Sequence, residues 1–223
     1  MKNKKERSKK KSKRKSNKTT KDHQGWKRTK RFFVRNYLES WDFLKESKNF
    51  IYFVFGVFIL FALFGFFIPA PESVAQEIMK IIQEILEITK GMTTSELIGF
   101  IFWNNVKVSF IGMISGILFG VIPFFETIIN GYLLGFVASH TVMADGIASL
   151  WRIFPHGIFE LPAVFISLGI GIRLGLYFFQ KKQRQKRNYK EIIVNSLRLF
   201  VFVIIPLLII AAVIEGFLIS FYN

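Results

Sequence analysis

The sequence predicts an all-α polytopic membrane protein with about five transmembrane helices and additional interfacial amphipathic helices. Hydrophobic residues make up 51% of the 223 residues, and the mean hydropathy is positive. This composition is more apolar than that of a soluble domain with one core. The apolar residues also form runs of about 20, the length that crosses the hydrocarbon layer as a helix.

The basic residues predict the topology. Residues 1–48 hold 19 of the 31 Lys and Arg residues, and residues 181–198 hold 7 more. Basic blocks beside apolar runs follow the positive-inside rule, whereas nucleic-acid binders usually spread their basic residues over a folded face. We therefore expect a multi-pass protein of the cell membrane with its N-terminus in the cytoplasm and its C-terminus outside. Nucleic acid is not an expected partner.

The N-terminal segment is predicted to form no core of its own. Residues 1–31 are rich in Lys, Arg, Ser and Asn, which is typical of disorder. We expect a disordered basic cytoplasmic tail that orients the protein and binds anionic lipid headgroups; binding of RNA or of a partner protein is the alternative. Residues 32–48 mix aromatic and charged residues at helical spacing, which predicts an interfacial amphipathic helix. The membrane domain is expected to cover residues 49–223.

Five spans are predicted in the membrane domain, and the connections between them have distinct signals. Pro123 is expected to end the second span and start a tight turn, so that the second and third spans form an antiparallel hairpin. Pro206 is expected to break the fifth span. The spans are predicted at about 50–69, 98–122, 125–143, 158–179 and 198–221.

Between the first two spans, apolar residues recur at i, i+3, i+4, i+7 and i+8, and most of the charged residues are glutamates. This pattern predicts an amphipathic helix at about 74–90. Its few basic residues suit the outer side of the membrane. The repeating apolar positions are Ile78, Ile81, Ile82, Ile85 and Leu86.

Glycines repeat at helical spacing in three of the spans. Small residues that share one helix face allow two backbones to approach closely in lipid. We therefore expect helix packing at Gly112, Gly116, Gly120, Gly135, Gly169, Gly171 and Gly175.

Polar residues inside membrane segments are costly, so each is a candidate for function or for structural pairing. The predicted topology places one group in a layer near the outer side: Asn104, Asn105, Lys107, His140, His156, Glu160 and Glu215. A second group lies toward the cytoplasmic end: Glu126, Asn130 and Arg173.

Each of these residues also has a purely structural interpretation. The asparagines can act as hydrogen-bonding contacts between helices, and Lys107 can extend to the interface. Arg173 is expected either to extend to the interface or to pair with Glu126. Pro155 is a suitable first residue of a helix.

His156 and Glu160 lie four residues apart, on one helical face. We expect Glu160 to pair with His156, with Lys107 or with the neighbouring asparagine amides, because an isolated carboxylate is not tolerated in hydrocarbon. A metal pair is less well supported, since catalytic zinc usually needs three protein ligands. The sequence contains no recognisable nucleophile, phosphate-binding or metalloprotease motif. We therefore expect no enzyme activity and no cofactor.

At these residues the chain resembles the stage II sporulation protein M family of multi-span membrane proteins. The shared features, in order, are Phe102 with Asn104-Asn105, the glycine repeat 112/116/120, Asn130-Gly131 with Gly135, Pro155-His156-Gly157 with Glu160, and Gly169 to Arg173. The resemblance implies an integral membrane scaffold that organises partner proteins, which in endospore formers are peptidoglycan-remodelling proteins. The basic tail is not part of the shared pattern.

Two functions of different classes follow. A scaffold or assembly protein would use the small-residue faces and the outer polar layer to bind other membrane or extracytoplasmic proteins, or a second copy of itself. A transporter or channel subunit would use the same layer as a hydrated path. Ionisable groups on several helices allow this, as do the fourth and fifth spans, which Pro162 and Pro206 are expected to break. We observe no inverted repeat of equal length, which favours the scaffold.

Overall fold

The structure is a computed structural model that describes residues 2–152, 154–181 and 187–222; the side chains of residues 2–25, 152, 154–159 and 220–222 are not described. Within these residues every regular element is a helix. The chain divides into two compact units, Met1–Glu39 and Ser40–Asn223. The predicted all-α, polytopic fold class is confirmed.

Helix α1 runs from Lys2 to Phe67 without a break. It therefore crosses the boundaries predicted at residues 31 and 48. Lys, Arg and Glu are good helix formers, so the local sequence is compatible with a helix even though it has no apolar stripe. The predicted disorder of residues 1–31 in solution stays a prediction.

Helix α2 spans Glu72–Thr89, and α3 spans Thr94–Ser115. A capping box begins α3: Glu96 donates its backbone N–H to Thr93 Oγ1, and Thr93 donates its backbone N–H to Glu96 Oε2 at 2.8 Å. These two bonds satisfy donors that a helix start leaves without partners.

The turn between α3 and α4 differs from its predicted position. Helix α3 ends at Ser115, and α4 covers Val121–Asp145. Phe119 and Gly120 both have positive φ, 57° and 73°, a conformation that ends helices. Pro123 does not end the second span but lies in the first turn of α4, where a residue without an N–H is tolerated.

The C-terminal half begins with the short helix η1 (Ile147–Arg152) and α5 (Phe154–Gly175), with Pro162 inside the latter. Helix η2 (Tyr177–Phe179) follows. The last helical stretch is continuous: α7 (Tyr189–Leu199), the π-helical turn η3 (Phe200–Ile204) and α8 (Ile205–Tyr222). The break predicted near Pro206 is therefore a π-helical turn, which leaves the helix unbroken.

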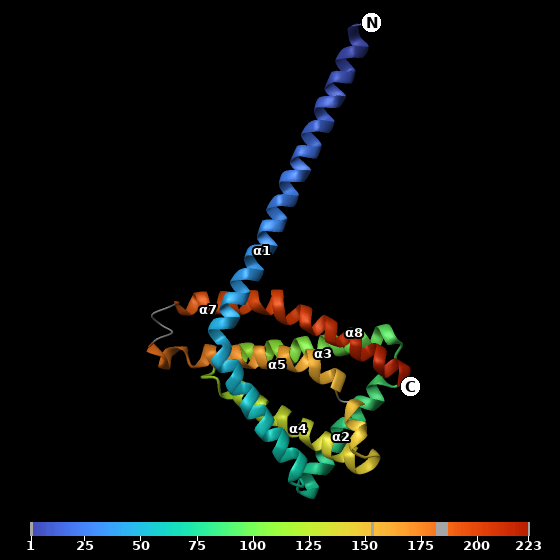
Figure 1. The fold of residues 1–223 in the computed structure, drawn as a ribbon, viewed down its shortest axis with the longest axis vertical. Helices are drawn as coiled ribbons and strands as arrows, with labels where there is room; N and C mark the ends of the chain where they lie inside the picture. Colours follow the sequence, from blue (N-terminus) through green and yellow to red (C-terminus); the bar gives the residue numbers. More distant parts are fainter. Residues whose placement is uncertain (1, 153, 182–186, 223) are drawn as a thin grey trace. The chain divides into compact units, whose positions relative to one another are not determined.

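In the unit that begins at Ser40, α3, α5 and α8 pack against one another, and α4 packs against α3 and α5 (Figure 1). The residue pairs give the direction of each helix. Helices α3 and α5 run the same way, because Gly116 faces Gly171 while Gly120 faces Gly175. Helix α8 runs opposite to α3, since Gly216 lies against Ile98 near the start of α3.

Helix α1 runs in the same direction as α4, because Phe58 lies against Gly131 and Ala62 against Gly135. It runs opposite to α5, because the Phe58 and Phe165 rings lie 4.9 Å apart and the Phe43 ring lies near Arg173. Helices α1, α4 and α8 therefore point one way, and α3 and α5 point the other. A chain that crosses a bilayer repeatedly needs this alternation.

Among the described residues, four helices are long and apolar enough to cross a membrane: Trp26–Phe67, Thr94–Ser115, Val121–Asp145 and Tyr189–Ile219. The fourth predicted span, 158–179, corresponds to α5 and is not among these four. The count of five spans and the predicted domain boundaries stay predictions.

Candidate functional site: glycine contacts and an ionic junction

The contact between α3 and α5 is made by backbone against backbone. A Cβ added to Gly116 would collide with the carbonyl group of Gly171, and one on Gly175 would collide with the backbone of Gly120. A Cβ on Gly171 would lie only 2.6 Å from the carbonyl oxygen of Gly112. The glycine repeat of the second predicted span therefore lies against glycines of the fourth, as small-residue faces do in membranes.

A second glycine contact joins α1 to α4. Cβ atoms on Gly131 and Gly135 would collide with the backbone of α1 at Phe58 and Ala62. Gly65 of α1 meets the backbone of Tyr132 in the same way. Gly65 was missed by the sequence analysis because it stands alone in an apolar run, without a second small residue four positions away.

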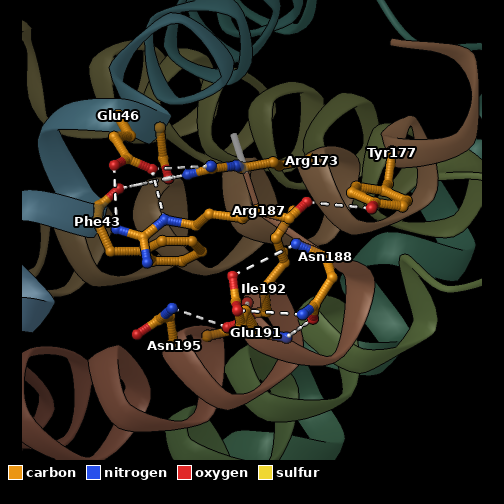
Figure 2. Close-up of polar contacts among 11 residues, drawn as sticks. Phe43, Glu46, Arg173, Tyr177, Arg187, Asn188, Glu191, Ile192 and Asn195 are labelled. Carbon is orange, nitrogen blue, oxygen red and sulfur yellow. Dashed lines mark hydrogen bonds and ion pairs between the residues drawn. The ribbon is translucent and has the colours of Figure 1, made fainter. Parts of the chain in front are cut away.

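An ionic junction connects α1 to the end of α5 (Figure 2). The Arg173 side chain is 4% exposed, and its guanidinium donates to Ser47 Oγ at 2.6 Å, to Glu46 Oε2 at 3.2 Å and to the carbonyl oxygen of Phe43 at 3.4 Å. The guanidinium carbon also lies 4.3 Å from the centroid of the Phe43 ring. Hydrogen bonds, an opposite charge and an aromatic face together stabilise the buried cation.

Arg187 completes the junction from the segment before α7. Its Nε donates to Glu46 Oε2 at 3.1 Å and its Nη2 to Glu46 Oε1 at 3.0 Å, which is a bidentate pair. The Tyr177 hydroxyl donates to the backbone carbonyl of Arg187 at 3.1 Å. Figure 2 shows the Glu46 carboxylate joined by dashed lines to both guanidinium groups. One carboxylate therefore joins α1 to both α5 and the segment before α7.

The sequence suggested that Arg173 either extends to the interface or pairs with Glu126. The structure differs from both expectations, because the carboxylate that binds Arg173 is that of Glu46. Glu46, Ser47 and Arg187 were not predicted from the sequence as members of the site. A signal for two of them was present, because Phe43, Glu46 and Ser47 lie at i, i+3 and i+4 and share one helical face.

Glu126 of α4 has a contrasting environment. Its Oε2 atom is buried, and within the described part of the chain no group donates a hydrogen bond to it. A Cβ on Gly112 would collide with this atom, so the missing side chain of Gly112 makes room for the carboxyl group. The Asn130 amide does not contact the carboxyl group but donates to the backbone carbonyl of Glu126 at 2.8 Å.

The predicted outer polar layer contains residues of different exposure. Asn104 and Lys107 are exposed, Asn105 and Glu215 are half-buried, and Glu160 is buried. The centroid of the His140 ring lies 4.0 Å from that of the Phe136 ring, and His140 Nδ1 is 3.0 Å from the Phe136 carbonyl oxygen.

The side chains of Pro155, His156 and Gly157 lie outside the described residues, so the pairing of Glu160 with His156 and the convergence of the layer stay predictions. Among the side chains that the structure describes, no three His, Cys, Asp or Glu residues are grouped to hold a metal ion.

Comparison with known proteins identifies the family to which the chain is similar. The family model described as Stage II sporulation protein M matches residues 54–219. Two proteins of Methanocaldococcus jannaschii, both described as uncharacterized, are similar to the chain. One is 35% identical over 121 residues, which are 52% of this chain and 66% of that protein. The other is 31% identical over 137 residues, which are 60% of each. The chain therefore spans less than two thirds of the length of these relatives. No solved structure matches the chain.

Proposed function

This chain belongs to the stage II sporulation protein M family, and on that premise we propose that it is an integral membrane scaffold that organises partner proteins. The observation that carries the proposal is the direct backbone contact at the glycines of α3 and α5. Backbones in contact leave no space for a hydrated path between these two helices. A rigid bundle of this kind is suited to present fixed surfaces to neighbours. The proposal includes no catalytic step.

The proposed topology has the N-terminus in the cytoplasm and the C-terminus outside the cell membrane. The bidentate contact of Glu46 with Arg187 supports it. Glu46 lies in the first basic block, residues 1–48, and Arg187 lies in the second, residues 181–198. A contact between the two blocks requires them to be on one side of the membrane, and the positive-inside rule assigns that side to the cytoplasm.

The proposed partners are the lipid bilayer, anionic headgroups bound by the basic segment 1–31, and other membrane or extracytoplasmic proteins, including a second copy of the chain. Affinity purification in mild detergent after cross-linking in the native host tests this proposal. We expect the same set of membrane or extracytoplasmic proteins in repeated purifications. Glu160→Gln removes one charge of the proposed outer layer and is expected to lower their recovery while the protein stays in the membrane.

A matched control for that experiment is Glu77→Gln, which removes a carboxylate from an exposed position on α2. It should leave recovery unchanged. Recovery from wild-type cells of the bait alone, with no cross-link between two copies of it, would contradict the scaffold.

A transporter or channel subunit is the second candidate, and Glu126 favours it. Glu126 is half-buried inside a span, and its buried carboxyl oxygen has no hydrogen-bond donor among the described residues. Carboxyl groups inside spans are typical of proton and ion pathways. The test is proton flux in vesicles that contain the purified protein, followed with an enclosed pH-sensitive dye. Flux that wild-type protein supports and Glu126→Gln abolishes would establish this candidate; equal flux with and without protein would exclude proton transport.

A further inference from the structure

Helix α2 divides into two opposite halves. Successive residues of a helix turn by about 100°, which places every charged residue between Glu72 and Thr89 on one half and the large apolar residues on the other. The charged residues are Glu72, Glu77, Lys80, Glu84 and Glu87. The large apolar residues are Val74, Ile78, Met79, Ile81, Ile82, Ile85, Leu86 and Ile88.

The protein covers only part of the apolar half. Ile78 is 7% exposed, whereas Ile81 is 54%, Ile85 47% and Leu86 62% exposed. A contiguous exposed face of isoleucines and leucines indicates a surface that binds a membrane or another molecule.

The connections of α2 to its neighbouring helices restrict what can cover this apolar face. Four residues, 68–71, separate it from α1, and four, 90–93, separate it from α3. Each connection can reach at most about 18 Å. Helices α1 and α3 run in opposite directions in the bundle, so the end of α1 and the start of α3 lie at the same side of the membrane. Both ends of α2 are therefore held within a short distance of one membrane surface.

We propose that α2 lies flat in the headgroup layer of the bilayer, with Ile81 and Ile85 in the acyl boundary and the glutamates in water. A helix of this type is stabilised by the apolar area that it inserts. The charged half carries four Glu and one Lys, so attraction to anionic lipid does not contribute. The occupant of the apolar face is thus the lipid itself, zwitterionic lipid included. The inference requires only that the chain is a membrane protein, and it does not depend on the scaffold function.

The chain contains no cysteine, so single cysteines can be introduced into the full-length protein and labelled with a nitroxide. We suggest Ile81→Cys and Ile85→Cys, with Glu77→Cys and Glu84→Cys as matched controls on the opposite half. All four positions are exposed, so these changes are expected to leave the fold intact. The labelled proteins are reconstituted into phosphatidylcholine vesicles, and collisions with oxygen and with a water-soluble nickel complex are measured.

The expected result is a higher oxygen-to-nickel collision ratio at positions 81 and 85 than at 77 and 84, because oxygen concentrates in lipid and the nickel complex in water. Equal, high nickel collisions at all four positions would place α2 in water and overturn the proposal. Low collisions with both reagents at 81 and 85 would mean that protein covers the face, and this would overturn it as well.

Discussion

Arg173 and Glu126 are two ionisable groups at the same end of the bundle, and their surroundings are opposite. They come from adjoining regions, since a Cβ on Gly171 would lie 3.2 Å from the Cβ of Pro123. Arg173 donates to a carboxylate, a hydroxyl and a carbonyl oxygen, and lies over an aromatic ring. Glu126 has a buried carboxyl oxygen to which no described group donates.

The difference shows two ways in which a bundle of membrane helices accommodates an ionisable side chain. Arg173 can remain a cation because other segments of the chain provide acceptors for it. A carboxyl group without partners is tolerated in an apolar environment as the neutral acid rather than as an isolated anion. Arg173 therefore has a structural role, whereas the buried carboxyl oxygen of Glu126 has no donor among the described residues and is available for another role.

The largest expected effect is that of Arg173→Gln. Breaking a buried, hydrogen-bonded ion pair by removal of one partner typically lowers the free energy of unfolding by about 3–5 kcal/mol. Glu46 is 30% exposed at its side chain, so we expect the lower part of that range. The loss in free energy of unfolding is measured by unfolding the protein in mixed detergent micelles. Lys45→Gln is the control, because Lys45 and Asp42 form an exposed pair and should contribute less than about 1 kcal/mol.

Gly112→Ala tests the space beside Glu126. The added Cβ would collide with Glu126 Oε2 and would lie 2.6 Å from Leu168 Cδ2, and overpacking of this kind typically destabilises by about 1–3 kcal/mol. Gly56→Ala is the matched control, because nothing lies within 4 Å of a Cβ there. Equal melting temperatures for the two variants would show that Glu126 does not occupy this space.

Arg187→Gln should destabilise less than Arg173→Gln. Its side chain is 29% exposed, so water can replace part of the lost pair, and we expect a loss of about 1 kcal/mol. Proteolysis of the purified protein gives a second readout. Release of the segment before α7 should speed cleavage between α5 and α7 in the variant relative to wild type.

The smallest expected effect is that of Glu126→Gln. Glutamine has nearly the shape of the neutral acid, and no described partner is lost. The free energy of unfolding should therefore change by less than about 1 kcal/mol, the net value of one hydrogen bond. A loss as large as that of Arg173→Gln would mean that Glu126 is a paired carboxylate after all.

The sequence predicted the helices well, because apolar runs of about 20 residues have few other stable arrangements in lipid. It placed the end of α3 too late, since Ile117, Leu118 and Phe119 continue the apolar run although the backbone has already turned. The glycine repeat identified residues that lie against another helix, but not which helix, because periodicity gives a face and not a neighbour.

The partner of Arg173 could not be predicted from local pattern. Glu46 lies 127 residues away in the sequence, in a segment whose charges suggested an interfacial helix. Glu126 was the nearer acidic residue in predicted depth. Depth alone does not decide a pairing, because each side chain must also point toward the other, and that depends on helix rotation.

Double-mutant cycles in the free energy of unfolding test the central claim, that Arg173 is neutralised by Glu46 and not by Glu126. One cycle combines Arg173→Gln with Glu46→Gln, and the other combines Arg173→Gln with Glu126→Gln. We expect a coupling of about 0.5–3 kcal/mol with Glu46, as for residues in one ion-pair network, and additivity within about 0.5 kcal/mol with Glu126. Coupling to Glu126 with additivity at Glu46 would contradict the account.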